Sequence, residues 1–131
     1  MNRKGREFEI EYEKYYRILD PLIYKVESPS FLIDKITGSK REVDILISFK
    51  DQENIERKIS IECRDRPNTV QDVTWIEQLA TKKNDLGIDI TIATTTNSFT
   101  KPAILKAQAY GIVVQTSTKI DEAFIKKLIQ V

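Results

Sequence analysis

The sequence predicts an α/β fold in which a mixed β-sheet carries helices on both of its faces. Two alternating, β-branched stretches flank the turn-like TGSK within residues 28–49, and a third strand pattern follows at 58–63. Apolar strand patterns at 88–95 and 112–116 then alternate with helical patterns. Parallel strands need a crossover connection, which is right-handed by the usual rule, so the second half predicts parallel pairing.

The first and last elements are expected to be amphipathic helices. In residues 6–22 the apolar side chains recur at helical spacing and end near Pro21: Phe8, Tyr12, Tyr16 and Leu19. The final segment, DEAFIKKLIQV, is preceded by Thr118, which with Asp121 predicts a helix start. These two helices would cover one face of the sheet or the other.

Two further helices are expected between the parallel strands. Residues 68–87 contain Thr69 followed three positions later by Asp72, a capping-box pattern, and Gly87 marks the end of this helix. Residues 98–111 form the second helix, with a proline in its first turn. Trp75 is expected to pack in the core.

Length and composition predict one domain, residues 1–131, without a membrane span. The 131 residues include 40% apolar and 31% charged side chains, as in soluble globular proteins. No signal peptide precedes the polar start, and Cys63 has no partner for an internal disulfide, so a cytoplasmic location is expected. The net charge of +1 gives no global attraction for nucleic acid, so such binding would need a local basic patch.

The chain contains no histidine. This excludes serine–histidine and cysteine–histidine nucleophiles, histidine zinc sites and histidine general bases. Only 4 glycines are present and none forms a phosphate-binding loop, which disfavours a nucleotide-binding α/β domain. Chemistry would therefore depend on carboxylates, Lys or Arg, hydroxyls or a bound hard cation.

The hairpin formed by residues 42–49 and 58–63 has a register that can be predicted. If its turn is centred on Glu53, Asp44 faces Glu62, and Glu42 faces Arg64. The opposite face is then an uninterrupted apolar surface made of Val43, Ile45, Ile47, Phe49, Ile59, Ile61 and Cys63. One register thus buries the apolar side chains and brings two carboxylates together.

Facing carboxylates destabilise a hairpin, so something must offset their repulsion. Three compensations are open for Asp44 and Glu62: a divalent cation, a raised pKa on one acid, or Arg64 placed between them. Carboxylate oxygens are ligands that Mg²⁺ prefers. The alternative interpretation is a solvated strand face in which Arg64 simply pairs with Glu62 or Glu42.

These residues resemble a known pattern. A carboxylate in one strand (EVD, ending at Asp44) followed by IECR in the next (Glu62 to Arg64) is similar to the motif of the PD-(D/E)xK nuclease superfamily. The opening GREFE and the closing NSFTKPAILKAQAYGI resemble Mrr-like restriction endonucleases and Holliday-junction-resolvase-like domains. The resemblance covers most of residues 5–115 and implies a restriction-endonuclease-like three-layer sandwich.

The resemblance also implies roles for individual residues. Asp44 and Glu62 would hold Mg²⁺ or Mn²⁺ with the Cys63 carbonyl, and Arg64 stands where the family usually has lysine. Glu9 and Gln78 match further catalytic positions. Six basic residues are expected to bind nucleic-acid phosphates: Lys40, Arg41, Arg66, Lys82, Lys83 and Lys101.

The function that follows is a Mg²⁺-dependent DNA endonuclease acting as a homodimer or with a partner that supplies specificity. Arginine differs from lysine because it cannot accept a proton and donates in a planar fork. The alternative is therefore a catalytically weakened nuclease-fold module that binds nucleic acid or a protein partner.

Overall fold

The computed structural model describes residues 24–116 and Lys127. The helices expected at 6–22 and 121–131 lie outside the described residues, apart from Lys127, which is helical. Within the described ranges, neither helix combines the length and the apolar composition of a membrane span.

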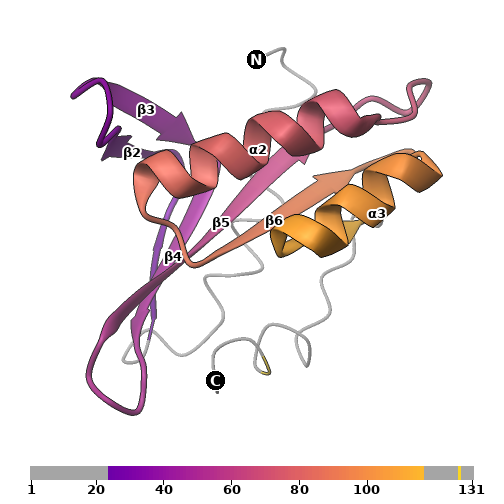
Figure 1. Ribbon diagram of the computed structural model, residues 1–131. Coiled ribbons are helices and arrows are strands. Elements are labelled where there is room, and N and C mark those ends of the chain that lie inside the picture. The colour runs from indigo at the N-terminus through magenta and orange to yellow at the C-terminus, as the bar shows by residue number, and fades with distance from the viewer. Residues whose placement is uncertain (1–23, 117–126, 128–131) are drawn as a thin grey trace.

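A five-stranded mixed sheet forms the centre of the structure (Figure 1). Its strands, in spatial order, are β1 (Tyr24–Glu27), β4 (Ile45–Lys50), β5 (Glu56–Arg64), β6 (Ile90–Thr95) and β7 (Ile112–Gln115). The pairs β1–β4 and β4–β5 are antiparallel, whereas β5–β6 and β6–β7 are parallel. The predicted mixed sheet is therefore confirmed, with β1 as a strand that the sequence pattern did not reveal.

Two strands form a separate antiparallel ribbon, β2 (Ser30–Ile33) with β3 (Lys40–Val43), beside one end of the helical layer (Figure 1). Its connection contains Gly38 at φ 74°, and the Asp34 carboxylate accepts the backbone N–H of Ile36 at 2.8 Å. The TGSK turn is confirmed. This polar connection fixes where the ribbon reverses.

The prediction of one continuous strand over residues 42–49 is wrong. Val43 pairs with Ser30 in the ribbon, whereas Ile45 pairs with Ile61 in the main sheet. The chain therefore changes sheets at Asp44, and this bend places Val43 against the helical side, where it packs with Leu46, Leu86 and Ile88. Val43 does not share the face of Ile45, contrary to the predicted apolar surface.

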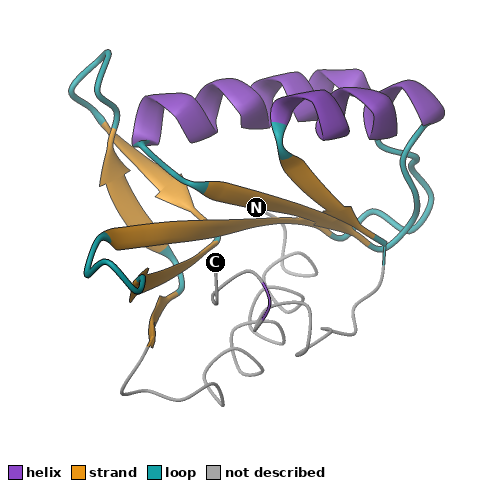
Figure 2. Cartoon of the chain, turned by 60° about the horizontal axis from the view of Figure 1, so that its bottom comes forward, coloured by secondary structure: helices purple, strands orange, loops and turns teal. Residues whose placement is uncertain are grey.

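Helix α2 (Val73–Leu86) and helix α3 (Lys101–Tyr110) provide the two crossovers and cover the same face of the sheet (Figure 2). Asp72 is the N-cap of α2, since its carboxylate accepts the Thr74 N–H at 2.9 Å. The helix therefore begins three residues later than expected, and the prediction that Thr69 caps it is wrong. Gly87, at φ 68°, ends α2 as predicted.

The buried side chains lie on both faces of the sheet. One face carries Cys63 and the apolar residues expected there: Ile45, Ile47, Phe49, Ile59 and Ile61, joined by Ile92. On the other face, the sheet and the two helices share a second apolar cluster: Trp75, Ile76, Leu79, Ala93, Phe99, Ala103, Ala107 and Ile112. Burial of Trp75 confirms its expected core role. Glu62 lies between Ile61 and Cys63 and points the opposite way, toward α2.

Candidate active site

The predicted hairpin register is confirmed. Ile45 pairs with Ile61 and Ile47 with Ile59, as a turn centred on Glu53 requires. This register brings Asp44 to the start of β4, beside the Glu62–Cys63 segment of β5. The predicted pairing of Glu42 with Arg64 is wrong, because Glu42 belongs to β3 and pairs with Phe31.

Asp44 is held in place by β5 and by the segment that connects β1 to β2. Its Oδ2 accepts the backbone N–H of Cys63 at 2.8 Å, and its carbonyl accepts the Ser28 hydroxyl at 2.9 Å. The residue is only 8% exposed. A carboxylate that accepts a backbone N–H at the change between two sheets has a defined direction, so the Asp44 side chain is held in one orientation.

Glu62 is a buried acid with a strongly perturbed ionisation. It is 8% exposed, and burial raises its pKa to about 7, with repulsion from Asp44 as the next cause. The nearby Lys82 ammonium opposes this increase, and Glu42 adds to it weakly. Of the three expected compensations, the raised pKa is therefore present.

Lys82 supplies the positive charge at this pair. Its Nζ lies 2.9 Å from Glu62 Oε1, and its side chain is only 16% exposed. The sequence analysis placed Lys82 among the phosphate-binding residues and did not predict this ion pair. A signal was available, since Lys82 follows Trp75 and Leu79 and precedes Leu86 at the spacing of a core-facing helix stripe.

Arg64 is engaged away from the acidic pair. Its Nη1 donates to Gln71 Oε1 at 2.8 Å, and its guanidinium carbon lies 4.7 Å from the centroid of the Trp75 ring. That ring stacks on Phe99 with centroids 6.0 Å apart. Among the described residues, the ion pair of Glu62 is with Lys82 and not with Arg64. Of the three compensations that the sequence left open, Arg64 placed between the two acids is therefore not the one observed.

Arg64→Met is expected to lower the free energy of unfolding by about 1–3 kcal/mol, because it removes a charged hydrogen bond and a cation–π contact. Urea denaturation measures this. Arg66→Met, at an exposed position two residues on, is the control and should change stability by less than about 0.5 kcal/mol. Equal stability of the Arg64 and Arg66 variants would contradict the structural role of Arg64.

Gln78 lies on the exposed side of α2, one turn before Lys82. It lines a shallow groove of about 360 Å³ together with Arg41, Glu77 and Thr81. Arg41 also pairs with Asp34 across 3.4 Å. The groove joins β3 to the outer side of α2, so Gln78 and Arg41 are brought together. Glu9, the other catalytic candidate, lies outside the described residues.

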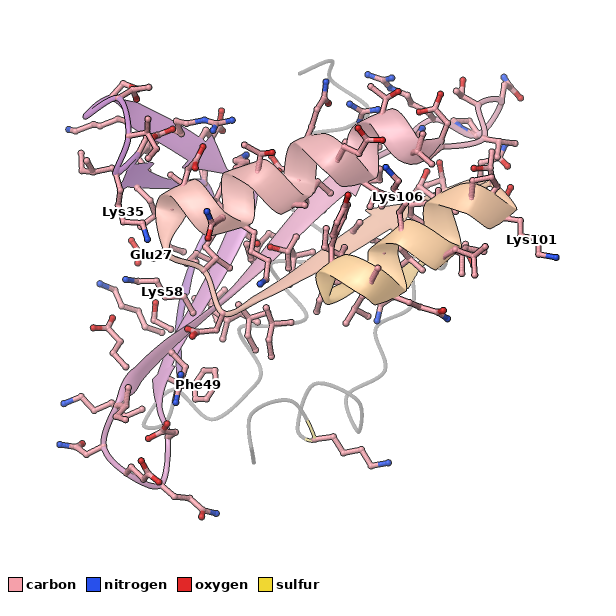
Figure 3. All side chains as sticks on the ribbon, in the orientation of Figure 1. Glu27, Lys35, Phe49, Lys58, Lys101 and Lys106 are labelled. Atoms are coloured by element: carbon pink, nitrogen blue, oxygen red, sulfur yellow. The ribbon has the colours of Figure 1, made fainter. Side chains whose placement is uncertain are left out.

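The remaining basic candidates are spread over the molecule. Lys40 is exposed on β3, Lys83 is half-buried in the last turn of α2, and Arg66 is exposed in the loop after β5. Lys101 is exposed at the start of α3, at the end of the helical layer away from Lys35 of the ribbon (Figure 3). These residues do not form one ring around the acidic pair, and their phosphate-binding role stays a prediction.

The two carboxylates belong to the class of ligands that hard cations take. Within the described residues, no group of three or more His, Cys, Asp or Glu side chains is placed to hold a metal ion. Mg²⁺, however, commonly uses one or two protein carboxylates and completes its shell with water and substrate phosphates. Glu62 Oε1 is buried, and among the described residues no donor has hydrogen-bond geometry to it, although Lys82 approaches it. Asp44 and Glu62 therefore offer oxygen ligands of the type that such a cation takes.

The sequence matches no protein-family model and no curated protein. Solved structures, in contrast, share the arrangement of strands and helices. A protein of unknown function, AF1548, superposes with a TM-score of 0.64 at 14% identity, over 82% of this chain and 56% of that one.

Two further similar structures are EndoMS and a restriction endonuclease. EndoMS in its apo form has a TM-score of 0.54 at 12% identity, over 92% of this chain and 49% of that one. The MspJI restriction endonuclease, in complex with a 27-mer oligonucleotide, has a TM-score of 0.52 at 15% identity, over 86% of this chain and 26% of that one. The chain thus spans less than two thirds of each of these proteins. The described residues have a restriction-endonuclease-like α/β fold.

Proposed function

We propose that this chain is a divalent-cation-dependent DNA endonuclease domain of the PD-(D/E)xK type, related to the Mrr-like enzymes. The observation that carries the proposal is the buried pair of Asp44 and Glu62, which lies where β4 begins and β5 nears its end. The fold likeness to MspJI, which is in complex with DNA in its structure, supports DNA as the substrate class. Perturbed, buried acids of this kind are common at catalytic sites.

In this proposal Asp44 and Glu62 hold the cation, with the Cys63 carbonyl as a further oxygen ligand. When bound, Mg²⁺ or Mn²⁺ would polarise the phosphate and lower the pKa of an attacking water. The protein contributes rigid placement, because Asp44 is fixed to the Cys63 N–H at 2.8 Å. Burial keeps the site poor in water, which strengthens its electrostatic interactions.

Substrate binding would use the groove between β3 and the outer side of α2. Arg41 and Gln78 line it, and one turn along α2 from Gln78 lies Lys82. With a net charge of only +1, the chain would depend on such local cations for phosphate contacts: Lys40, Arg66, Lys83 and Lys101 are the other proposed ones. Glu9 is proposed to complete the acidic cluster. A homodimer, or a partner module, would provide the second cut and the specificity.

Incubation with supercoiled plasmid, linear duplex and four-way branched DNA in Mg²⁺ or Mn²⁺ tests the proposal. The wild-type protein is expected to give nicked or linear products only when a divalent cation is present. Asp44→Ala and Glu62→Ala are expected to abolish them. Cleavage that persists in EDTA, or in both variants, would show that another centre or a contaminant is responsible.

A second function is favoured by one observation, the engagement of Arg64 with Gln71 and Trp75. If the usual lysine position has become structural, the chain would act as a nuclease-fold module that binds nucleic acid or a protein partner without cutting. Salt-sensitive DNA binding that needs no metal and survives Glu62→Ala, with no cleavage on any substrate, would support this function.

A further inference from the structure

We propose that Lys82, and not Arg64, provides the positively charged side chain of the active centre. This inference rests on the proposed nuclease function and names the residue that acts on the scissile phosphate. Lys82 comes from α2, eighteen positions after the place where the sequence motif expects a lysine. Its ammonium nevertheless lies 2.9 Å from the Glu62 carboxylate.

The position of Lys82 on α2 is set by packing. Trp75, Leu79 and Leu86 are 4–6% exposed and contact the sheet or its flanking loops. Lys82 falls in the same stripe, so its aliphatic stem must run along the sheet before its charge reaches Glu62. On β6, the residue paired with Glu62 is Ala93, whose small side chain faces α2 and leaves room for this stem.

Arg64 has no comparable freedom. The residue that accepts its hydrogen bond, Gln71, is 3% exposed and is tied to the loop after β6 by backbone bonds with Ser98 and Thr100, each 2.9 Å. The guanidinium also covers Trp75. Moving Arg64 to the acidic pair would break the hydrogen bond and the ring contact together, and it would leave the buried Gln71 amide oxygen unpaired.

The charges at the pair fit this assignment. Asp44 and Glu62 carry two carboxyl groups, and Lys82 neutralises one of them through its contact with Glu62. The remaining negative charge can attract a hard cation. When DNA and a cation bind at the carboxylates, the ammonium is close enough to turn from Glu62 to a phosphate oxygen. An ammonium on a flexible stem suits this change of partner better than a stacked guanidinium.

Cleavage rates of four variants test the proposal. Under single-turnover conditions with plasmid DNA and saturating Mg²⁺, Lys82→Met is expected to be slower by about 100-fold, the effect of losing one donor to a transition-state oxyanion. Lys50→Met, at an exposed position at the far end of β4 from Asp44, is the control and should stay within about threefold. Arg64→Met and Arg64→Lys, assayed below their unfolding temperatures, should also stay within about tenfold of the wild type.

A second readout does not depend on activity. Calorimetry with Mn²⁺ in the absence of DNA should show tighter binding to Lys82→Met than to the wild type, by about tenfold, because a competing ammonium is removed from Glu62. Lys50→Met should bind Mn²⁺ as the wild type does. Unchanged Mn²⁺ affinity in Lys82→Met would overturn the assignment of its charge to this pair.

The outcomes separate the two proposals. Wild-type cleavage that Lys82→Met retains, or that folded Arg64→Met loses to the same extent as Lys82→Met, overturns the role of Lys82 and leaves the nuclease function intact. A wild-type protein that cleaves no DNA in any divalent cation overturns the nuclease function and with it the catalytic role of Lys82. The Mn²⁺ titration still decides whether the ammonium belongs to the acidic pair.

Discussion

Asp44→Asn is expected to lower the rate of DNA cleavage by at least about 1,000-fold while the protein stays folded. The amide oxygen of asparagine can accept the Cys63 N–H, which Asp44 Oδ2 now accepts at 2.8 Å, so the backbone contact is kept. Only the negative charge is removed. The variant therefore separates the electrostatic role of the side chain from its structural one.

The rate constant for loss of supercoiled plasmid in saturating Mg²⁺ measures this effect, with urea denaturation to verify folding. Asp89→Asn is the control, because its exposed carboxylate accepts the Lys58 N–H at 2.8 Å nearer the other end of β5. This control should cleave within about threefold of the wild type. If a folded Asp44→Asn variant keeps more than a tenth of the wild-type rate, Asp44 is not part of the catalytic centre.

Glu62→Gln is expected to stabilise the metal-free protein at pH 8 while it removes activity. The Glu62 carboxyl has an ordinary pKa of 4.5 in the unfolded chain and a pKa of about 7 in the folded protein. Between these values the folded state holds a proton that the unfolded state has lost. The free energy of unfolding therefore falls as the pH rises from about 4.5 to about 7, and it stays low above that range.

The glutamine side chain has no proton to lose in this range. The free energy of unfolding of Glu62→Gln should therefore not show the decrease that the Glu62 carboxyl causes between about pH 4.5 and about pH 7. One pKa unit corresponds to 1.36 kcal/mol, and the pKa of about 7 already includes the opposing effect of Lys82, so the expected gain is about 1–3 kcal/mol at pH 8. Urea denaturation in EDTA at pH 5 and pH 8 measures the difference. The charged groups that shift the Glu62 pKa are Asp44, Lys82 and Glu42, and all three are retained in the Glu62→Gln variant.

The matched control is Glu77→Gln on the exposed side of α2, where Glu77 pairs with Lys106 at 3.0 Å. It should change stability by less than about 0.5 kcal/mol at both pH values. If Glu62→Gln is less stable than the wild type at pH 8, the raised pKa of the Glu62 carboxyl is refuted. A destabilisation that is equal at pH 5 and pH 8 would refute it as well.

The register of the central hairpin was predictable because its apolar residues alternate with a period of two. Only one pairing buries Ile45 and Ile47 against Ile59 and Ile61, and a slip by one residue would expose them all. The same alternation places Asp44 beside Glu62. The central geometry of the site therefore follows from local pattern alone.

The bend at Asp44 was not predictable from that pattern. Alternation runs through Glu42, Val43 and Asp44 without a break, and the change of sheet depends on the pairing of Val43 with Ser30, thirteen residues earlier. Long-range pairing of this kind leaves no local signal. The start of α2 was misjudged for a related reason, since Thr69 and Asp72 can both cap a helix and tertiary packing selects Asp72.

The side chain that pairs with Glu62 is not the one that the hairpin pattern suggested. Arg64 follows Glu62 on the same side of β5, which made it the natural neighbour, but the Trp75 ring and Gln71 take its guanidinium. Lys82 was not recognised because it is followed by Lys83, and two consecutive lysines usually mark a solvated helix face. Its place in the apolar stripe of α2 was the signal that would have revealed it.

The central claim is that Asp44 and Glu62 together form one centre for a hard divalent cation. Calorimetric titration of the DNA-free protein with Mg²⁺ and Mn²⁺ at pH 8 tests it most directly, with wild type, Asp44→Asn and Glu62→Gln compared at equal concentration. The wild type is expected to bind the cation at a single class of site, and each substitution is expected to weaken that binding by at least about tenfold. Wild-type affinity in both variants would contradict the claim.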